Sequence, residues 1–277
     1  MTPRLMGIVN ANPDSFSDPG ARALDDLVAA ALAQVEAGAD MIDIGGESGV
    51  THVAPVSAEE ESARVVPLVD RLVREGLTVS VDTWKAAVAE AVLAAGARLI
   101  NDVSGLRDPA VADACARHDA GLVVMHTRAE PKVKAFPDYE DVVTDVHDFL
   151  VDRIALARER GVDEEKIVID PGPDFAKTPA ETVDVLRRLA DLRELGHPIL
   201  LAVSRKDFVG ALTGRRPSER LAGTLGAIAV LAEHADILRV HDVAAVADFL
   251  RVRNALVSTA NGVQELDPGL RTEDPVG

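Results

Sequence analysis

Polar side chains stand where each short apolar run of this chain ends. They are Asn10, Asp43, Asp82, Asn101, His126, Asp170, the string Ser204-Arg205-Lys206, and Arg239 with His241. Several have glycine, proline or another small residue beside them, which lets the backbone approach a ligand and holds a short side chain in place. A lone aspartate after a strand is more often a helix N-cap, so the prediction of a binding site rests on the whole set.

Three of these residues predict an anion site. Lys206, Arg239 and His241 follow two successive apolar runs near the C-terminus, which predicts a compact cationic corner. Such a corner suits a phosphate or diphosphate, and arginine binds these groups through two parallel hydrogen bonds. Asn10 offers a neutral oxygen, which suits Mg²⁺ that keeps most of its waters and takes its other ligands from a diphosphate.

Three others predict a site for a flat heterocycle. Asp82, Asn101 and Asp170 supply carboxylate and amide acceptors and one amide donor. They match a ring rich in N–H donors. Because a buried polar group left without a partner costs about 1–3 kcal/mol, such a site should reject rings that lack this donor edge.

The elements that must position these residues follow a repeated order of strand and helix. Strands are predicted at Leu5–Val9, Met41–Ile44, Thr78–Val81, Leu99–Ile100, Gly121–Met125, Ile167–Ile169, Ile199–Val203 and Ile237–Val240. Amphipathic helical patterns follow them, as at Leu24–Glu36, Ala58–Arg74, Lys85–Ala95, Pro109–His118 and about Val142 to Arg160, with a break at Gly214–Pro217.

Strands this apolar, each followed by a helix, indicate a parallel sheet covered by helices. Eight such units in this length favour an α/β protein with a single-domain (β/α)8 (TIM) barrel, whose active site lies at the C-terminal ends of the strands. A doubly wound sheet is the alternative, but no glycine-rich fingerprint follows the first strand. The barrel is expected over residues 1–266, with a polar tail over 267–277.

Composition narrows the function classes. The net charge of −17 and the aromatic content of 3% disfavour nucleic acid as a partner. No apolar segment of signal-peptide or membrane-spanning length is present, so a cytoplasmic protein without a membrane partner is expected. The single cysteine, Cys115, excludes a disulfide within the chain and is read as a buried structural thiol.

Eight strings, in order along nearly the whole chain, resemble dihydropteroate synthase. They are Met6-Gly-Ile-Val-Asn10, Asn12-Pro-Asp-Ser-Phe-Ser-Asp18, Asp43-Ile-Gly-Gly-Glu-Ser48, Ser80-Val-Asp-Thr83, Ile100-Asn-Asp-Val103, Asp170-Pro-Gly172, Ser204-Arg-Lys206 and Arg239-Val-His-Asp-Val243. Any one string would be weak, whereas the ordered combination is highly specific. The resemblance implies a homodimeric, Mg²⁺-dependent transferase of folate synthesis. That family joins 6-hydroxymethyl-7,8-dihydropterin diphosphate to p-aminobenzoate and releases pyrophosphate, in an SN1-like reaction.

The resemblance also implies roles for individual residues. The pterin would be bound by Asp43, Asp82, Asn101, Asp170 and Lys206; the pyrophosphate by Asn10, Arg239 and His241, with Asn10 on the Mg²⁺; and p-aminobenzoate by Phe175 and Ser204. Asp82, Lys206 and Asp18 would be catalytic. Asp18 would act from a first loop that also carries Asp14 and Phe16 and shields the reacting carbon from water.

The sequence departs from the family in its loops. Gly49-Val-Thr-His52 stands where Thr-Arg-Pro-Gly is usual, and Asp174 and Ala176 occupy positions where glycine is usual. Because the departures fall around the second-substrate site, three hypotheses follow. The first is a working dihydropteroate synthase. The second is a pterin-binding paralogue with another amine acceptor or without synthase activity. The third is a pterin-dependent methyltransferase, which the cationic corner and the lack of a corrinoid-binding domain disfavour.

Overall fold

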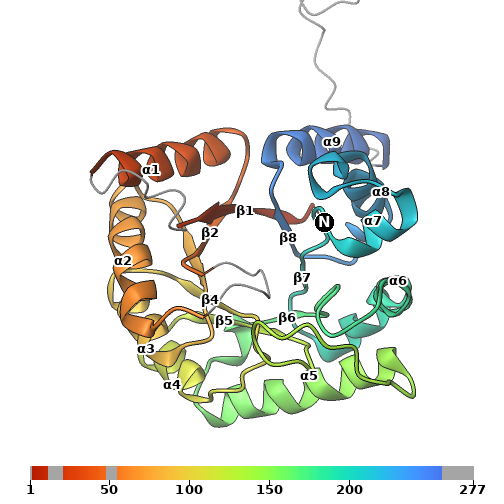
Figure 1. The fold of residues 1–277 in the computed structure, drawn as a ribbon, viewed down its shortest axis with the longest axis horizontal. Coiled ribbons are helices and arrows are strands. Elements are labelled where there is room, and N and C mark those ends of the chain that lie inside the picture. Colours follow the sequence, from red (N-terminus) through yellow and green to blue (C-terminus); the bar gives the residue numbers. More distant parts are fainter. Residues whose placement is uncertain (1, 12–20, 48–54, 258–277) are drawn as a thin grey trace, which may run out of the picture.

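Runs of β-branched and aliphatic residues form eight strands in the computed structural model, which describes residues 2–11, 21–47 and 55–257 (Figure 1). The strands are β1 (Arg4–Asn10), β2 (Met41–Gly45), β3 (Val79–Asp82), β4 (Leu99–Asp102), β5 (Gly121–Met125), β6 (Ile167–Asp170), β7 (Leu200–Leu201) and β8 (Ile237–Val240). All their pairings are parallel, in the order β6-β5-β4-β3-β2-β1-β8-β7.

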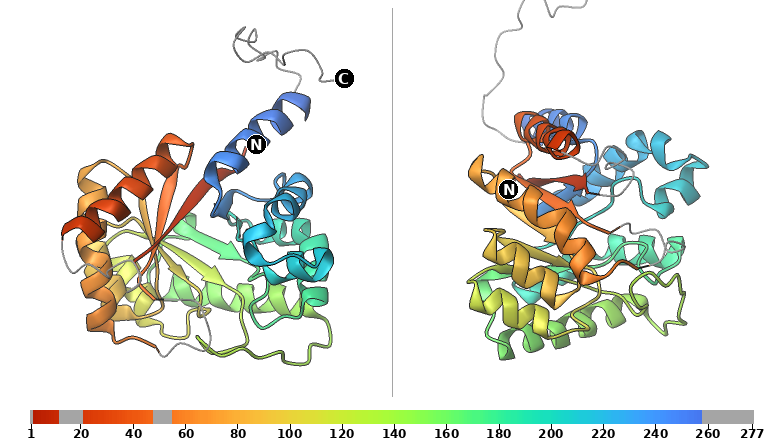
Figure 2. Two further views of the ribbon diagram at one scale, coloured as in Figure 1. Left: turned by 45° about the horizontal axis from the view of Figure 1, so that its top comes forward. Right: turned by 60° about the vertical axis from the view of Figure 1, so that its left-hand side comes forward.

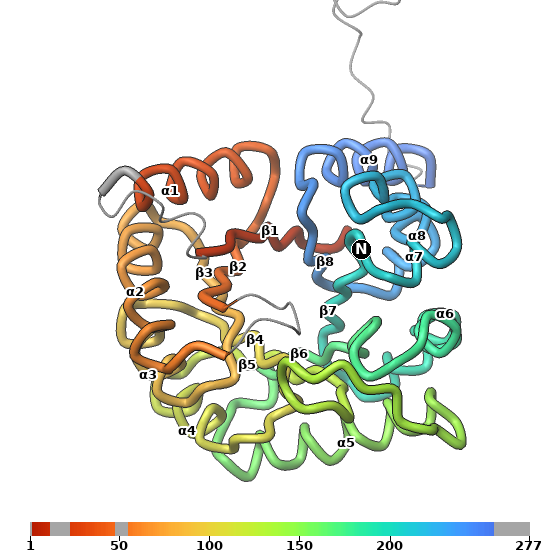
Figure 3. The backbone as a smooth tube through the Cα atoms, in the orientation of Figure 1, coloured from red at the N-terminus to blue at the C-terminus, as the bar shows by residue number. Residues whose placement is uncertain are grey.

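The sheet closes on itself. An isolated parallel bridge between Ile169 and Ile199 joins the two ends of that order, β6 and β7. The backbone tube and the two turned views show the strands enclosed by a ring of helices (Figures 2 and 3). This confirms the prediction of a (β/α)8 barrel over a doubly wound sheet.

Helices follow the strands and cover the outside of the barrel. They are α1 (Ala21–Glu36), α2 (Ala58–Arg74), α3 (Ala86–Ala94), α4 (Ala110–Arg117), α5 (Val142–Glu159), α6 (Pro179–Arg187), α7 (Asp207–Thr213), α8 (Leu221–Leu231) and α9 (Val243–Val257). Short 3-10 turns occur at Glu164–Lys166, Leu189–Leu195 and Pro217–Glu219. The predicted break at Gly214–Pro217 is confirmed, because Gly214 ends α7 with a left-handed backbone.

Strand alternation decides what faces the barrel axis. Outward side chains such as Ile42, Val81 and Ile100 pack beneath the helices in the main core, and the buried Cys115 joins them. Inward side chains form a separate apolar layer that comprises Met6, Met41, Val123, Val168, Leu200, Ala202 and Ile237. Two residues further along β2 and β8, the same inward face carries Asp43 and Arg239. The polar site therefore lies on an apolar floor.

The seventh strand differs from its prediction. Ile199–Val203 was expected to be a strand, but ladder pairing covers only Leu200–Leu201 besides the Ile199 bridge. The chain leaves the ladder because it turns tightly towards Arg205, whose φ is +59°. The predicted domain boundary at 266/267 lies outside the described residues. Within the described part of the chain, no helix has both the length and the apolar character needed to cross a membrane.

Candidate active site

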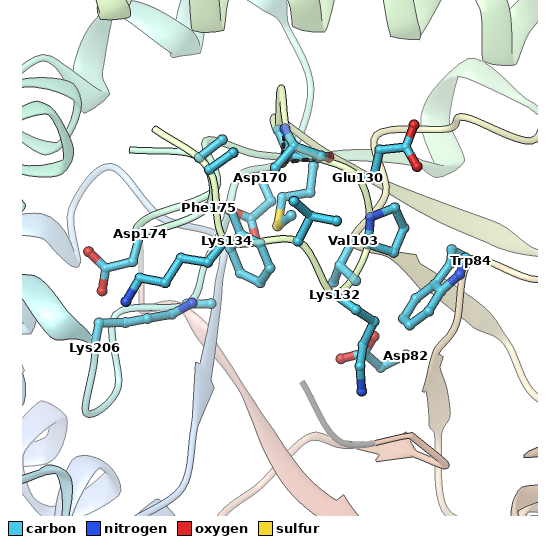
Figure 4. A pocket seen from close by; sticks show the side chains of 18 of the residues that line it. Asp82, Trp84, Val103, Glu130, Lys132, Lys134, Asp170, Asp174, Phe175 and Lys206 are labelled. Carbon is cyan, nitrogen blue, oxygen red and sulfur yellow. Dashed lines mark hydrogen bonds between the residues drawn. The ribbon is translucent and has the colours of Figure 1, made fainter. Parts of the chain in front are cut away.

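A cavity of about 440 Å³ opens at the C-terminal ends of the strands. Its wall includes Asp82, Asn101, Asp170 and Arg239 from strand ends, and Trp84, Val103 and Met125 beside them. Three further segments complete it, over residues 129–136, 174–176 and 205–207. In Figure 4, Lys206 and Asp174 lie at one end and Trp84 and Asp82 at the other, with Phe175 between them. Strand ends thus bring together residues that are far apart in the sequence.

Arg239 connects the carboxylates at the bottom of the cavity. Its Nε donates to Asp43 Oδ2 at 2.6 Å, and its Nη2 donates to Asp82 Oδ2 at 3.0 Å. Asp43 is fully buried and accepts further hydrogen bonds from Ser80 Oγ at 2.6 Å and Asn101 Nδ2 at 3.2 Å. Asp43 therefore lies beneath the cavity wall and holds Arg239 and Asn101 in place.

One acceptor in the cavity wall lacks a protein partner. The amide of Asn101 donates to Asp43, which leaves its Oδ1 buried and without a hydrogen-bond partner among the described residues. A buried acceptor of this kind costs about 1–3 kcal/mol. A ligand N–H directed at Asn101 would remove that cost.

Burial shifts the ionisation of the groups around the cavity. Desolvation, opposed by Arg239 and reinforced by Asp43, raises the pKa of Asp82 to about 7. Desolvation also raises the pKa of Asp170 and lowers that of Lys206. The Lys206 ammonium lies 4.4 Å from the centroid of the Phe175 ring, within cation–π distance. Perturbed carboxylates and a perturbed lysine around one cavity are typical of an active site.

The three residues of the predicted cationic corner have different surroundings. Arg239 is directed at Asp43 and Asp82 and is charge-paired by them. His241 is not part of the cavity wall. Desolvation and the Arg205 and Arg239 cations lower its pKa to about 4, so it is neutral at pH 7. Of the three residues, Lys206 and Arg239 line the cavity. Asp43 of β2 and Asp82 of β3 attract the Arg239 guanidinium across the barrel.

The other predicted site residues differ in how they lie relative to the cavity. Phe175 lines the cavity, whereas Ser204 is buried beside it and accepts from the His241 backbone N–H at 3.2 Å. Asn10 is exposed at the end of β1, close to Gly45. Asp18 and the altered loop around Gly49 and Val50 lie outside the described residues.

Sequence reasoning missed part of the cavity wall. Trp84 follows Asp82 by two residues, and this spacing after a strand end was an available signal. The stretch 127–139 was not assigned to the site from the sequence, yet its Lys132 and Lys134 line the cavity. Lys132 contacts Glu47 Oε1 at 3.3 Å. A long loop between two barrel elements was itself a sign of a functional role.

Comparisons with known proteins agree with this geometry. Residues 6–241 match the family model described as "Pterin binding enzyme". The chain is 40% identical over 258 residues to a dihydropteroate synthase of Bacillus subtilis, covering 92% of this chain and 88% of that protein. An Escherichia coli dihydropteroate synthase is 38% identical over 260 residues, with 92% of each covered.

Solved structures give the same result. A Xanthomonas albilineans dihydropteroate synthase with 4-aminobenzoic acid is 47% identical, with a TM-score of 0.85 over 92% of this chain and 93% of that one. A second structure of the enzyme from that organism, in complex with 7,8-dihydropteroate, is 46% identical, with a TM-score of 0.82 over 92% and 94% of the two chains. The chain therefore belongs to the dihydropteroate synthases, transferases of folate biosynthesis within the pterin-binding enzyme family.

Proposed function

We propose that the cavity at the strand ends joins 6-hydroxymethyl-7,8-dihydropterin diphosphate to p-aminobenzoate and releases pyrophosphate. One observation carries this proposal: four side chains converge on one cavity, those of Asp82, Asn101, Asp170 and Lys206. The side-chain oxygen of Asn101 has no hydrogen-bond partner there among the described residues. The related structures hold 4-aminobenzoic acid and 7,8-dihydropteroate, the second substrate and the product of this reaction. No observation favours the paralogue or the methyltransferase.

The donor edge of the pterin pairs with the acceptors of the cavity. Asp82, Asn101 and Asp170 accept from its ring N–H and amino groups, and Lys206 donates to a ring acceptor. Asp43 acts from below by holding Arg239 and Asn101. Phe175 provides an apolar wall beside Lys206. A ring without the donor edge would leave these acceptors unpaired, so we expect the site to reject such a ring.

Reaction begins with departure of the diphosphate. The methylene C–O bond breaks and its electron pair leaves with pyrophosphate, so the methylene carbon becomes cationic and conjugated with the ring. The amine lone pair of p-aminobenzoate then forms the C–N bond, and the nitrogen loses a proton. Lys206 and Arg239 offset charge on the leaving group. The roles of Asp18 as a shield, and of His241 and Asn10 towards pyrophosphate, remain predictions.

The residues fit a magnesium ion that arrives with the substrate. Among the described residues, no group of three or more histidine, cysteine, aspartate or glutamate side chains could hold a metal. Asn10 offers one neutral oxygen, and Mg²⁺ commonly combines one or two protein ligands with substrate phosphates and waters. Asn10 would hold the ion, which when bound would neutralise the leaving diphosphate.

The second substrate and the partner subunit complete the proposal. Phe175 would contact the p-aminobenzoate ring, and Ser204, which is buried beside the cavity, would help to form the same site. A homodimer would form through α7 and α8, where Leu212 is 72% and Val230 68% exposed and an apolar cavity of about 430 Å³ opens. Such exposed apolar surface favours an interface. The cytoplasmic location stays a prediction.

Turnover tests the proposal. The protein is incubated with the pterin diphosphate and Mg²⁺, with and without p-aminobenzoate, while pyrophosphate and dihydropteroate are measured. We expect equal amounts of both products, dependent on the amine and abolished by a chelator. Tight pterin binding without dihydropteroate would contradict synthase activity and favour the paralogue. In that case Gly49→Thr with Val50→Arg should restore turnover if the altered loop is the cause.

A further inference from the structure

Lys177 is a buried cation that the site described above does not use. It lies between β6 and α6, directly before Thr178, the N-cap of α6. Only 1% of its surface is exposed, and it is not among the residues that line the cavity. Lysine is rarely buried this deeply unless its ammonium group is fully paired, so its contacts need an explanation.

The ammonium group of Lys177 has one acceptor for each of its three hydrogens. Nζ lies 2.6 Å from His126 Nδ1, 3.0 Å from the Gly172 carbonyl oxygen and 3.1 Å from the Phe175 carbonyl oxygen. An ammonium group has three donors and no acceptor. The match therefore pairs all three donors without a carboxylate in contact, while desolvation lowers the pKa of Lys177 to about 7.

His126 anchors this lysine to the neighbouring strand and helix. Its Nδ1 accepts from Lys177, so its other nitrogen, Nε2, carries the proton and donates to Asp145 of α5 at 2.8 Å. Asp145 is held in turn by two hydrogen bonds from Arg128 at 2.9 and 2.8 Å. Desolvation and Lys177 lower the pKa of His126 to about 3, which keeps the ring neutral and able to accept.

The segment held by Lys177 has a strained backbone. Between Asp170 and Lys177, φ is +65° at Gly172, +63° at Asp174 and +50° at Ala176. The first tolerates no side chain, because a Cβ on Gly172 would lie 2.1 Å from the His126 carbonyl oxygen. The other two are residues with side chains in a left-handed conformation, which is strained for residues other than glycine. They are also two positions at which the resemblance to dihydropteroate synthase leads us to expect glycine.

The same segment carries four residues of the cavity wall, Asp170, Asp174, Phe175 and Ala176. Asp170 begins it and accepts from the Gly172 N–H at 2.7 Å, and Phe175 lies within it. Asp174 accepts from the backbone N–H groups of Asp207 and Phe208 at the start of α7. The Tyr139 hydroxyl also donates to the Ala176 carbonyl at 2.7 Å. A shift of this backbone would therefore move both a pterin acceptor and the wall beside Lys206.

We propose that Lys177, seated on His126, is a positioning residue that holds the strained segment 170–176 so that Asp170 and Phe175 meet the substrates. The inference rests on the proposed function for its catalytic meaning. It does not make Lys177 a catalytic residue, since its ammonium contacts only protein atoms of the described chain. It also explains how this chain tolerates Asp174 and Ala176 in place of glycine.

Replacing Lys177 by methionine tests the role with little change in side-chain volume. In Lys177→Met we expect faster amide hydrogen exchange over residues 170–177, at least a tenfold rise in the KM for the pterin diphosphate, and a lower kcat. A matched control is Leu72→Ala, which opens a buried site near the C-terminal end of α2. The control should lower Tm comparably but leave KM and exchange over 170–177 as in the unaltered protein.

Relief of strain provides a second arm. In the Lys177→Met background, Ala176→Gly should recover part of the lost pterin affinity, because glycine adopts positive φ without strain. Unchanged exchange over 170–177 in Lys177→Met would overturn the holding role. Faster exchange with unchanged KM, or a KM change that Leu72→Ala reproduces, would overturn the link to the substrates. Lack of turnover by the unaltered protein would contradict the proposed function instead, and exchange would still decide whether Lys177 holds the segment.

Discussion

Two cations at the same mouth of the barrel have opposite surroundings. Arg239 lines the cavity and contacts two carboxylates, Asp43 and Asp82. Lys177 lies outside the cavity wall and contacts an imidazole nitrogen and two backbone carbonyls. A cation paired with carboxylates at a cavity can exchange part of its pairing for a ligand, whereas a cation enclosed by neutral acceptors can only hold the backbone. The contacts of the two residues therefore indicate a binding role for Arg239 and a positioning role for Lys177.

We therefore expect removal of the Arg239 side chain to cost more free energy than removal of the Lys177 side chain. Removing Arg239 leaves two buried carboxylates without their cation, and breaking a buried pair in this way costs about 3–5 kcal/mol. Removing Lys177 leaves neutral carbonyls unpaired, at about 1–3 kcal/mol. Loss of Arg239 should therefore reduce kcat/KM more than loss of Lys177. Loss of Lys177 should act mainly on the KM for the pterin diphosphate.

The largest effect is expected for Arg239→Met. We expect kcat/KM to fall by more than about 100-fold, which corresponds to about 2.7 kcal/mol, and Tm to fall as well. Initial rates and thermal unfolding measure the two effects. Arg239→Lys should recover little, since lysine cannot reproduce the two directed contacts. A loss of activity smaller than that of Lys177→Met would invert the comparison.

A smaller effect is expected from the ionisation of Asp82, which should make pterin affinity depend on pH. The pKa of Asp82 is raised to about 7 by desolvation. Because the ionised form accepts from the pterin, affinity is full above pH 7 and declines as the carboxylate takes up its proton below it. The dissociation constant of a reduced pterin should therefore rise about tenfold between pH 8 and pH 6. Calorimetry measures it, and Asp82→Asn should bind weakly with no such slope; a slope retained in that variant would assign the titration to another group.

The strands and the strand-end residues of the cavity could be predicted from the sequence because their signals are local. Apolar runs fix strand positions, and the residue that ends each run faces the mouth of a barrel by geometry. Asp82, Asn101 and Asp170 were located in this way. The alternation of each strand then accounts for their common inward face.

The pairings could not be predicted, because they join residues that are distant in the sequence. Asp43 and Arg239 are 196 residues apart, and nothing local indicates that their side chains meet. Lysine is ordinarily exposed, so the burial of Lys177 has no local signal. Asp174 and Ala176 were visible as departures from glycine, but only the backbone angles give the reason.

The most direct test is a crystal structure of the protein soaked with 6-hydroxymethyl-7,8-dihydropterin. We expect the ring in the cavity at the strand ends, with its donor edge on Asp82, Asp170 and the Asn101 side-chain carbonyl, and with Lys206 on its acceptor side. Lys177 should keep its contacts with His126 and the 170–176 segment. A ring bound elsewhere, or bound in the cavity without contact to these acceptors, would contradict it.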